Sequence, residues 1–189
     1  MLYKLAHIIL IKFPWVWECI EWLNTVLFKA RYRKYLPHVT ELATIKDSKA
    51  LVAFFERQPQ DTFTYFRPHP FDERHITKLL KRPSMLMHVI YIDGKVAGYC
   101  FLRCFFIGKG YRGYIVDSNQ RKKGVGKALG LWLNQTAQTL HIRTFKTINA
   151  NNEASLHLAK ATCLLNKIQD MQNGDAEYEC LIDTNNEKN

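Results

Sequence analysis

A short basic loop with two glycines is the part of the sequence best suited to bind a ligand. Its residues are Arg121, Lys122, Lys123, Gly124, Val125, Gly126 and Lys127. An apolar stripe at helical spacing follows, so we expect a helix to begin there. Backbone N–H groups at a helix start lack an intrahelical acceptor, and the helix dipole adds partial positive charge to them. Glycine lets the main chain approach a ligand closely, and we therefore predict that residues 121–127 form a pyrophosphate cradle.

The spacing of the cradle separates it from two other phosphate-binding loops. A P-loop needs Gly-x-x-x-x-Gly-Lys followed by Ser or Thr, and a dinucleotide-binding turn needs Gly-x-Gly-x-x-Gly. The sequence instead has Arg-x-x-Gly-x-Gly, from Arg121 to Gly126, after an apolar strand end at Val116. The alternative interpretation is an ordinary strand-to-helix turn with a solvated basic face.

A second stretch, residues 63–71, has the character of a pocket wall. It is aromatic, stiffened by prolines and basic, which makes it too rigid and too apolar for a plain linker. Aromatic walls with a few polar groups are typical of substrate pockets. His69, between two prolines, is positioned to contact an acceptor or to take its proton. The alternative is a packed loop in which His69 hydrogen-bonds a backbone group.

Composition restricts the class of protein and of partner. The chain of 189 residues suffices for one domain with a core and an appendage. Its net charge of +10, from 27 basic and 17 acidic residues, favours nucleotides, nucleic acid or an anionic membrane surface. The five cysteines include no C-x-x-C pair and lie in apolar segments, so we expect reduced, buried thiols in a cytoplasmic protein. The histidines are scattered, and we expect no metal site.

Residues 1–36 form an arm that differs in character from the main domain, residues 37–189. The arm holds three of the four tryptophans, and charged residues interrupt each window that approaches the roughly 20 apolar residues of a membrane span. It has no small-residue cleavage site after its short apolar run, which argues against a signal peptide. We expect two helical pieces joined near Phe13-Pro14.

Two roles for the arm remain open. It could pack on the main domain or on a second subunit, in which case the protein would be a homodimer. Alternatively, it could be an interfacial anchor on the inner membrane face, with its tryptophans at headgroup level. Its basic residues would then contact anionic lipid; they are Lys29, Arg31, Arg33 and Lys34.

The main domain alternates strand and helix signals. We expect a short strand at 38–45, a helix from an Asp47-Ser48 cap to Arg57, and a helix capped by Asp72 and ended by Pro83. Strands are expected at 85–92, 96–106, 111–118, 143–148, 166–171 and 178–182, with a helix after the cradle and another at 153–165. Asp93-Gly94 predicts a tight hairpin. The order strand, helix, strand, helix from residue 111 implies neighbouring parallel strands.

The Arg-x-x-Gly-x-Gly loop after a valine-ended strand resembles the acyl-CoA-binding signature of the GNAT superfamily of N-acetyltransferases. The resemblance covers residues 40–183 and implies a mixed α/β sheet, mostly antiparallel and flanked by helices, that splays open beside Val116. It also implies that the backbone of Val116 holds the pantetheine of acetyl-CoA and that the amides of Lys122 to Lys127 hold the pyrophosphate. Asn151 and Ala154 match the family's Asn-x-x-Ala/Ser.

The sequence departs from the family's catalytic residues at two places. The tyrosine that protonates the leaving thiolate falls on Leu158, and no carboxylate stands between Gly94 and Val116, where many members have a glutamate base. Ser155, one turn before Leu158, or water could supply the acid. The remaining candidates for the base are Asp117, His69 and His88.

The function that follows is transfer of an acetyl group from acetyl-CoA to the amine of a small molecule by direct attack. We expect a cytoplasmic enzyme that needs no metal, and we do not expect nucleic acid as a partner. Three alternatives stay open: a membrane-associated acyltransferase with a longer acyl donor or a lipid-linked acceptor, a CoA-binding module without catalysis, and an acetyltransferase that acts on protein or RNA.

Overall fold

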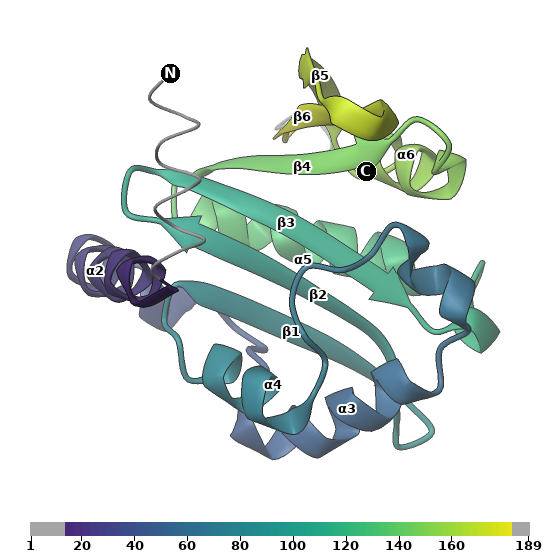
Figure 1. Cartoon of the computed structure of the whole chain (residues 1–189), viewed down its shortest axis with the longest axis horizontal. Coiled ribbons are helices and arrows are strands. Elements are labelled where there is room, and N and C mark those ends of the chain that lie inside the picture. Colours follow the sequence, from purple (N-terminus) through teal and green to yellow (C-terminus); the bar gives the residue numbers. More distant parts are fainter. Residues whose placement is uncertain (1–13, 183–189) are drawn as a thin grey trace.

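A mixed six-stranded sheet carries the fold (Figure 1). The computed structural model describes residues 14–182. The strands are β1 (Met85–Ile92), β2 (Lys95–Phe105), β3 (Lys109–Val116), β4 (Arg143–Asn149), β5 (Leu164–Asp170) and β6 (Asp175–Leu181). The helices are α2 (Pro14–Tyr32), α3 (Ser48–Glu56), α4 (Glu73–Leu80), α5 (Val125–Thr139) and α6 (Glu153–Lys160). The strand order is β1-β2-β3-β4-β6-β5.

The pairing of the strands confirms the predicted mostly antiparallel sheet. Every pair of neighbouring strands in residues 14–182 is antiparallel except β3 and β4. Asp93 and Gly94 form the turn between β1 and β2 with φ of 51° and 71°, as a two-residue hairpin requires.

The sheet opens between β3 and β4. Their register runs only from Lys109↔Arg143 to Tyr111↔Phe145. Beyond that point β3 still pairs with β2 as far as Val116, and β4 still pairs with β6 as far as Asn149. The facing edges of β3 and β4 are therefore unpaired over their second halves, and Figure 1 shows β4 diverging from β3 there. This is the splay that the resemblance implies.

Each face of the sheet has its own apolar core. The inner stripe of α5, including Leu129 and Leu133, packs with Cys100 and Leu102 of β2. On the other face, α3 and α4 pack against the side chains of alternate strand positions; this core includes Leu51, Phe54, Phe55, Ile76, Met87, Tyr99, Phe101 and Ile115. Side chains of adjacent strand residues point to opposite faces, so the residue number along β2 decides which face a side chain serves.

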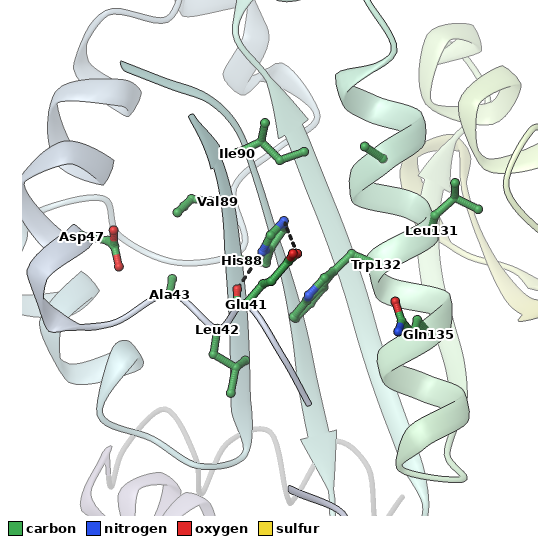
Figure 2. A pocket seen from close by; sticks show the side chains of 11 residues that line it. Glu41, Leu42, Ala43, Asp47, His88, Val89, Ile90, Leu131, Trp132 and Gln135 are labelled. Carbon is green, nitrogen blue, oxygen red and sulfur yellow. Dashed lines mark hydrogen bonds and ion pairs between the residues drawn. The ribbon is translucent and has the colours of Figure 1, made fainter. Parts of the chain in front are cut away.

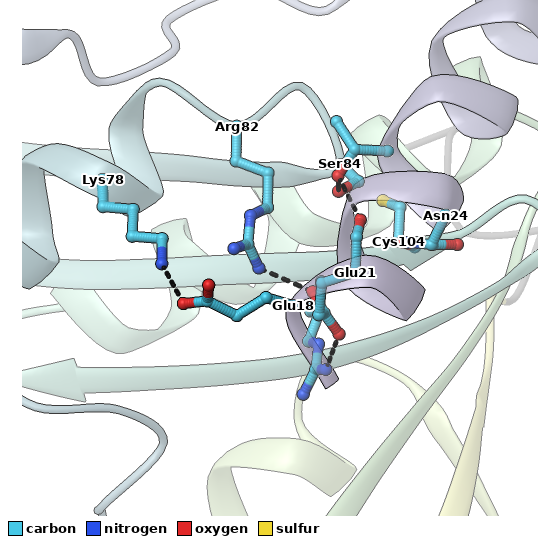
Figure 3. Close-up of polar contacts among 9 residues, drawn as sticks. Glu18, Glu21, Asn24, Lys78, Arg82, Ser84 and Cys104 are labelled. Atoms are coloured by element: carbon cyan, nitrogen blue, oxygen red, sulfur yellow. Dashed lines mark hydrogen bonds and ion pairs between the residues drawn. The ribbon is translucent and has the colours of Figure 1, made fainter. Parts of the chain in front are cut away.

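Helix α2 is fixed to the end of β2 by buried polar contacts (Figure 3). Glu21 is buried and pairs with Arg82 at 2.6 Å and with Arg103. The Asn24 side-chain amide donates to the Cys104 carbonyl and its oxygen accepts from the Phe106 N–H, each at 3.0 Å. The arm therefore packs on the main domain through one stripe of α2. The expected helical piece before Pro14 lies outside the described residues.

Three local expectations are wrong in detail. Residues 38–45 form no strand, because Glu41 takes a left-handed φ of 58° and the flanking residues form 3-10 turns at Leu36–His38 and Ile45–Asp47. The helix expected over 153–165 ends at Lys160, and β5 begins at Leu164. Cys19 is exposed, whereas the other four thiols are buried as expected.

Both predicted helix caps lie at helix starts, and one of them bonds differently. Asp72 caps α4 by accepting from the His75 N–H at 3.0 Å, as expected. Asp47 occupies the cap position of α3, but its carboxylate accepts from the Thr44 N–H and the Tyr91 hydroxyl instead.

Candidate active site

The cradle lies at the end of β3, next to the splay. After Val116 a 3-10 turn, Ser118–Gln120, leads into the loop, and α5 begins at Val125. Gly124 occupies the N-cap position with φ of +84°, a left-handed conformation that favours glycine. The first helical bond runs from the Ala128 N–H to the Gly124 carbonyl at 3.0 Å. The N–H groups of residues 125–127 therefore have no acceptor within the helix.

Gly126 serves a different purpose from Gly124. It is the second residue of α5 and not one of the glycines with positive φ, so its backbone does not require glycine. A Cβ on Gly126 would lie 2.5 Å from Cδ2 of Leu158 and 3.4 Å from Cγ2 of Val116. The missing side chain thus lets α6 close on the first turn of α5, beside the unpaired end of β3.

Four basic side chains surround these N–H groups. Arg121 donates to the Thr62 hydroxyl at 3.2 Å, and Lys123 donates to the Gln120 side chain at 3.1 Å. Lys122 and Lys127 are exposed, while Val125 is buried in the core, so Val125 offers a ligand its backbone N–H alone. The contact of Arg121 with Thr62 places the segment before the aromatic wall alongside the cradle.

Asp117 holds the loop between β3 and the cradle. Its buried carboxylate pairs with Arg57 at 2.8 Å and caps the following 3-10 turn through the Asn119 N–H at 3.0 Å. Burial acts to raise the pKa of Asp117, but the hydrogen bonds from Asn119, Arg57 and Gln58 outweigh it and lower the pKa overall. A carboxylate held in this way is a poor proton acceptor at neutral pH. Its contacts explain how the cradle is positioned and do not support a role as base.

His69 joins the aromatic wall to the sheet. Its Nδ1 lies 2.9 Å from the Pro70 carbonyl, and its Nε2 lies 3.0 Å from the Tyr99 hydroxyl. The carbonyl can only accept, so Nδ1 carries the proton and Nε2 accepts from Tyr99. Burial lowers the pKa of His69, and the ring is therefore neutral at pH 7. Both ring nitrogens are engaged in hydrogen bonds, so His69 connects the aromatic wall to Tyr99 of β2.

An open pocket lies on the outer side of this wall. It has a volume of about 810 Å³. Its lining combines apolar and aromatic side chains with the carboxylates of Glu56 and Asp72 and the guanidinium of Arg67, and Asp72 is paired with His75 at 2.6 Å. Aromatic rings beside carboxylates suit an organic cation such as a protonated amine.

The aromatic cluster reaches the strand that borders the splay. The ring of Phe101 covers Gly113 of β3, since a Cβ there would lie 2.6 Å from Cε1 of Phe101. Phe66 and His69 lie next to Phe101, with ring centroids 6.4 and 6.2 Å away. The wall of residues 63–71 was expected from the sequence, whereas Phe101 and Gly113, which join it from the sheet side, carry no local signal.

A buried lysine lies on the opposite face of the splay. Lys146 of β4 is 5% exposed, and its ammonium donates to the Tyr114 hydroxyl of β3 at 3.0 Å. It also lies 3.4 Å from the Ser155 hydroxyl of α6 and over the Tyr114 ring, 4.2 Å from the centroid. β3 and β4 are not paired with each other at these positions, so the contact bridges the open gap. Burial lowers the pKa of Lys146 to about 8.

Ser155 is thus close to a proton donor, whereas Asn151 shows no comparable contact. The Ser155 N–H donates to the Asn152 side chain, which caps α6, at 3.0 Å. Asn151 is exposed, and its N–H donates to the Asn149 side chain at 3.0 Å. Its part in binding the cofactor stays a prediction.

His88 lies in a separate pocket of about 630 Å³ (Figure 2). Its ring stacks on Trp132 of α5 with centroids 4.8 Å apart, and Nδ1 lies 2.7 Å from the Glu41 carbonyl. His88 pairs with Cys100 on β2 and therefore faces α5, whereas His69 contacts Tyr99 on the other face. This histidine is on the wrong side of the sheet to serve the aromatic pocket.

The described residues show neither a metal site nor a membrane span. Within residues 14–182, no three His, Cys, Asp or Glu side chains are arranged to hold a metal ion. No helix in that range is long and apolar enough to cross a bilayer.

Comparison with known proteins agrees with this geometry. The sequence model of the Acetyltransferase (GNAT) family matches residues 51–163, more than half of the chain. No curated protein is significantly similar to the chain in sequence.

Solved structures share the fold at low sequence identity. The PaiA N-acetyltransferase from Thermoplasma acidophilum, in complex with coenzyme A, superposes with a TM-score of 0.63 at 14% identity, over 74% of this chain and 95% of that one. YncA, a putative acetyltransferase from Salmonella typhimurium with acetyl-CoA, has a TM-score of 0.61 at 19% identity, over 76% and 92%. RimL, a ribosomal L7/L12 α-N-protein acetyltransferase in complex with coenzyme A, has a TM-score of 0.61 at 16% identity, over 76% and 93%. On the match of the family model, the chain belongs to the GNAT family of acetyltransferases.

Proposed function

We propose that the protein transfers an acetyl group from acetyl-CoA to the amine of a small molecule. The observation that carries this proposal is the splay between β3 and β4, which opens directly onto the cradle. An extended pantetheine arm would pair with the free backbone edge at Val116, and its pyrophosphate would accept from the N–H groups of residues 125–127. PaiA and RimL, which share the fold, are complexes with coenzyme A.

The two faces of the splay suggest separate roles in the reaction. The acceptor would enter from the aromatic side, where Glu56 and Asp72 attract its ammonium form. It would lose that proton to water in the open pocket, because only a neutral amine attacks a thioester. The new C–N bond forms as the C–S bond breaks, the nitrogen gives its second proton to water, and the CoA thiolate leaves. Lys146, on the α6 side and in contact with the Tyr114 hydroxyl, would give that thiolate its proton and regain one from water.

The size of the pocket favours a small acceptor. About 810 Å³ accommodates a drug-sized molecule. RimL shows that a protein acetyltransferase can share the fold, so the acceptor must be tested directly. We would follow the release of free CoA thiol from acetyl-, succinyl- and palmitoyl-CoA against aromatic amines, amino sugars, polyamines and peptides with free N-termini. Turnover confined to peptides would contradict a small acceptor, and no turnover with any amine would favour a CoA-binding module.

Replacing His69 with alanine should loosen the acceptor wall and destabilise the fold. The buried Tyr99 hydroxyl would lose its acceptor, and such an orphan costs about 1–3 kcal/mol. We expect a lower melting temperature, a higher KM for the amine and nearly unchanged affinity for acetyl-CoA.

Tyr99→Phe is the matched control for His69→Ala. It removes the same hydrogen bond without leaving a buried polar group, so its loss of stability should be smaller. Neither variant should change the shape of the pH–rate profile if His69 acts only by connecting the wall to Tyr99. If His69→Ala abolishes the rising limb of that profile and Tyr99→Phe does not, His69 is the base after all.

A further inference from the structure

The outer face of α2 is apolar and exposed, although the helix is firmly packed. The side chains of Trp22, Leu23 and Val26 are 67%, 50% and 44% exposed. At 100° per residue these three share one side of the helix with Cys19 and Ala30, opposite the stripe that is buried. The residues of this outer face are Cys19, Ile20, Trp22, Leu23, Val26, Leu27 and Ala30, and none is charged.

The buried side of α2 fixes the orientation of the helix. Glu21 pairs with Arg103 of β2 (Figure 3), the Asn24 amide donates to the Cys104 carbonyl, and Phe28 is fully buried in the core. A helix held at these points cannot rotate its apolar side inward. The apolar outer face is therefore presented in a fixed orientation.

The turn between β2 and β3 lies beside α2. Ile107 is 56% exposed and follows Phe106, whose N–H and carbonyl are bound by Asn24 and Arg31 of α2. A contiguous exposed apolar surface often marks a site of contact with another molecule.

Basic residues gather at the C-terminal end of this surface. Lys29 and Arg31 stand on the flanks of the apolar face, and exposed Arg33 and Lys34 follow the helix. The nearest acidic side chains of α2, Glu18 and Glu21, pair with Lys78, Arg82 and Arg103 of the domain. The positive charge at this end is therefore not neutralised by α2 itself.

We propose that the outer face of α2 lies on the surface of an anionic lipid bilayer. Trp22, Leu23 and Val26 would enter the headgroup–acyl boundary, where indole rings are favoured, and the basic end would contact lipid phosphates. A second copy of the chain is the other natural occupant of an apolar face. Two copies of the chain, however, each carry a net charge of +10 and repel one another, whereas anionic lipid complements that charge.

The membrane contact would attach the enzyme to the bilayer but would not bring a lipid to the active site. α2 packs where β2 ends, at Cys104 to Phe106, and Phe105 pairs with Lys109 at the start of β3. The cradle follows Val116, at the far end of β3. Lipid bound at α2 is thus separated from the splay by the length of the strand, and this inference does not depend on the proposed acetyl transfer.

The test is co-sedimentation of the full chain with vesicles of phosphatidylcholine alone and with 30% phosphatidylglycerol added. We expect binding to the anionic vesicles that falls with rising salt, and a blue shift of tryptophan fluorescence. Leu23→Glu should reduce the binding by about tenfold or more, because a charge enters the apolar contact. Leu164→Glu is the matched control, since Leu164 is 66% exposed on β5, and it should bind like the parent protein.

Charge reversal and chain length provide the second arm of the test. Lys29→Glu with Lys34→Glu leaves the apolar face intact and should lower the affinity for anionic vesicles by about tenfold or more. Deletion of residues 1–13 should leave vesicle binding in place. The proposal is wrong if Leu23→Glu binds vesicles like the parent, if binding is lost only on deletion of residues 1–13, or if the protein ignores vesicles and sediments as a dimer that Leu23→Glu dissociates.

Discussion

Lys146→Met should lower the rate of acetyl transfer by roughly a hundredfold while it leaves the affinity for acetyl-CoA nearly unchanged. A positioned general acid contributes on the order of 10²–10⁴ to a rate. Lys146 is the buried cation that bridges the splay, and its partners Tyr114 and Ser155 come from β3 and α6. Methionine keeps the length and the apolar character of the side chain, so the experiment removes the proton donor with little change in packing.

The pH dependence distinguishes a proton donor from a fixed charge. With a pKa of about 8, Lys146 is protonated at pH 7 and loses its proton as the pH rises through 8. The parent enzyme should therefore lose activity above pH 8, on top of the gain that comes from deprotonating the amine. Lys146→Met should keep the gain and lose the decline. Lys146→Arg should also lose the decline, because arginine does not titrate there.

Lys146→Met should also be more stable than the parent protein at neutral pH. The pKa of Lys146 is lowered from 10.5 to about 8, so the folded state disfavours the charged form. Below pH 8 both states carry the proton and the cost is present in full, on the order of 3 kcal/mol; it is relieved as the pH rises from 8 toward 10.5. We expect Lys146→Met to raise the free energy of unfolding at pH 7 by about 1–3 kcal/mol.

Tyr114→Phe is the control variant: it changes how the Lys146 ammonium is positioned but leaves Lys146 as the proton donor. It removes the hydroxyl that accepts from Lys146 but keeps the ring beneath the ammonium. We expect a rate loss smaller than that of Lys146→Met and a retained decline above pH 8. If Lys146→Met transfers acetyl groups at the parental rate, the acid is another group or water, and Ser155→Ala becomes the next variant to measure.

Local signals in the sequence predicted the cradle and most of the sheet. Asp93-Gly94 and Gly124 each take the positive φ for which glycine or aspartate in a turn is suited, and such preferences depend on neighbours in the chain. The strand expected at 38–45 failed because the positive φ of Glu41 has no signature in its residue type. A helix end was misplaced where α6 stops so that β5 can begin.

The proposed catalytic face could not be predicted from the sequence because its residues come from distant elements. In the sequence Lys146 looks like an ordinary strand lysine. It shares one face of β4 with Thr144 and Ile148, and both of these residues are buried. Its burial depends on α6, and its partner Tyr114 belongs to another strand. In the same way, Asp117 was proposed as a base from its position after β3, and its ion pair with Arg57 becomes visible only when α3 is in place.

Gly126→Val should abolish tight binding of acetyl-CoA. The new side chain would meet Leu158, whose Cδ2 lies 2.5 Å from the Cβ position, and would also crowd Val116. Because the side chain is attached next to the N–H of residue 126, it would also crowd a diphosphate bound at that group. Loss of about two charge-assisted hydrogen bonds to the diphosphate would cost on the order of 2 kcal/mol or more. Calorimetry with acetyl-CoA measures this loss directly.

A second-site change separates the two effects of the valine. Leu158→Ala removes the atoms that the new side chain meets, so Gly126→Val with Leu158→Ala should regain most of the lost melting temperature. If the backbone N–H groups hold the diphosphate, the double variant should still bind acetyl-CoA weakly, while its affinity for pantetheine, which lacks the diphosphate, should match that of Leu158→Ala alone.

Gly124→Ala should act more mildly, at about 1 kcal/mol for the left-handed conformation, because nothing lies within 4 Å of its Cβ position. Lys122→Ala should be milder still, since an exposed charge is screened. If Gly126→Val binds acetyl-CoA with the affinity of the parent protein, the diphosphate is bound elsewhere. The roles proposed for residues 121–127 and for the splay would then both be wrong.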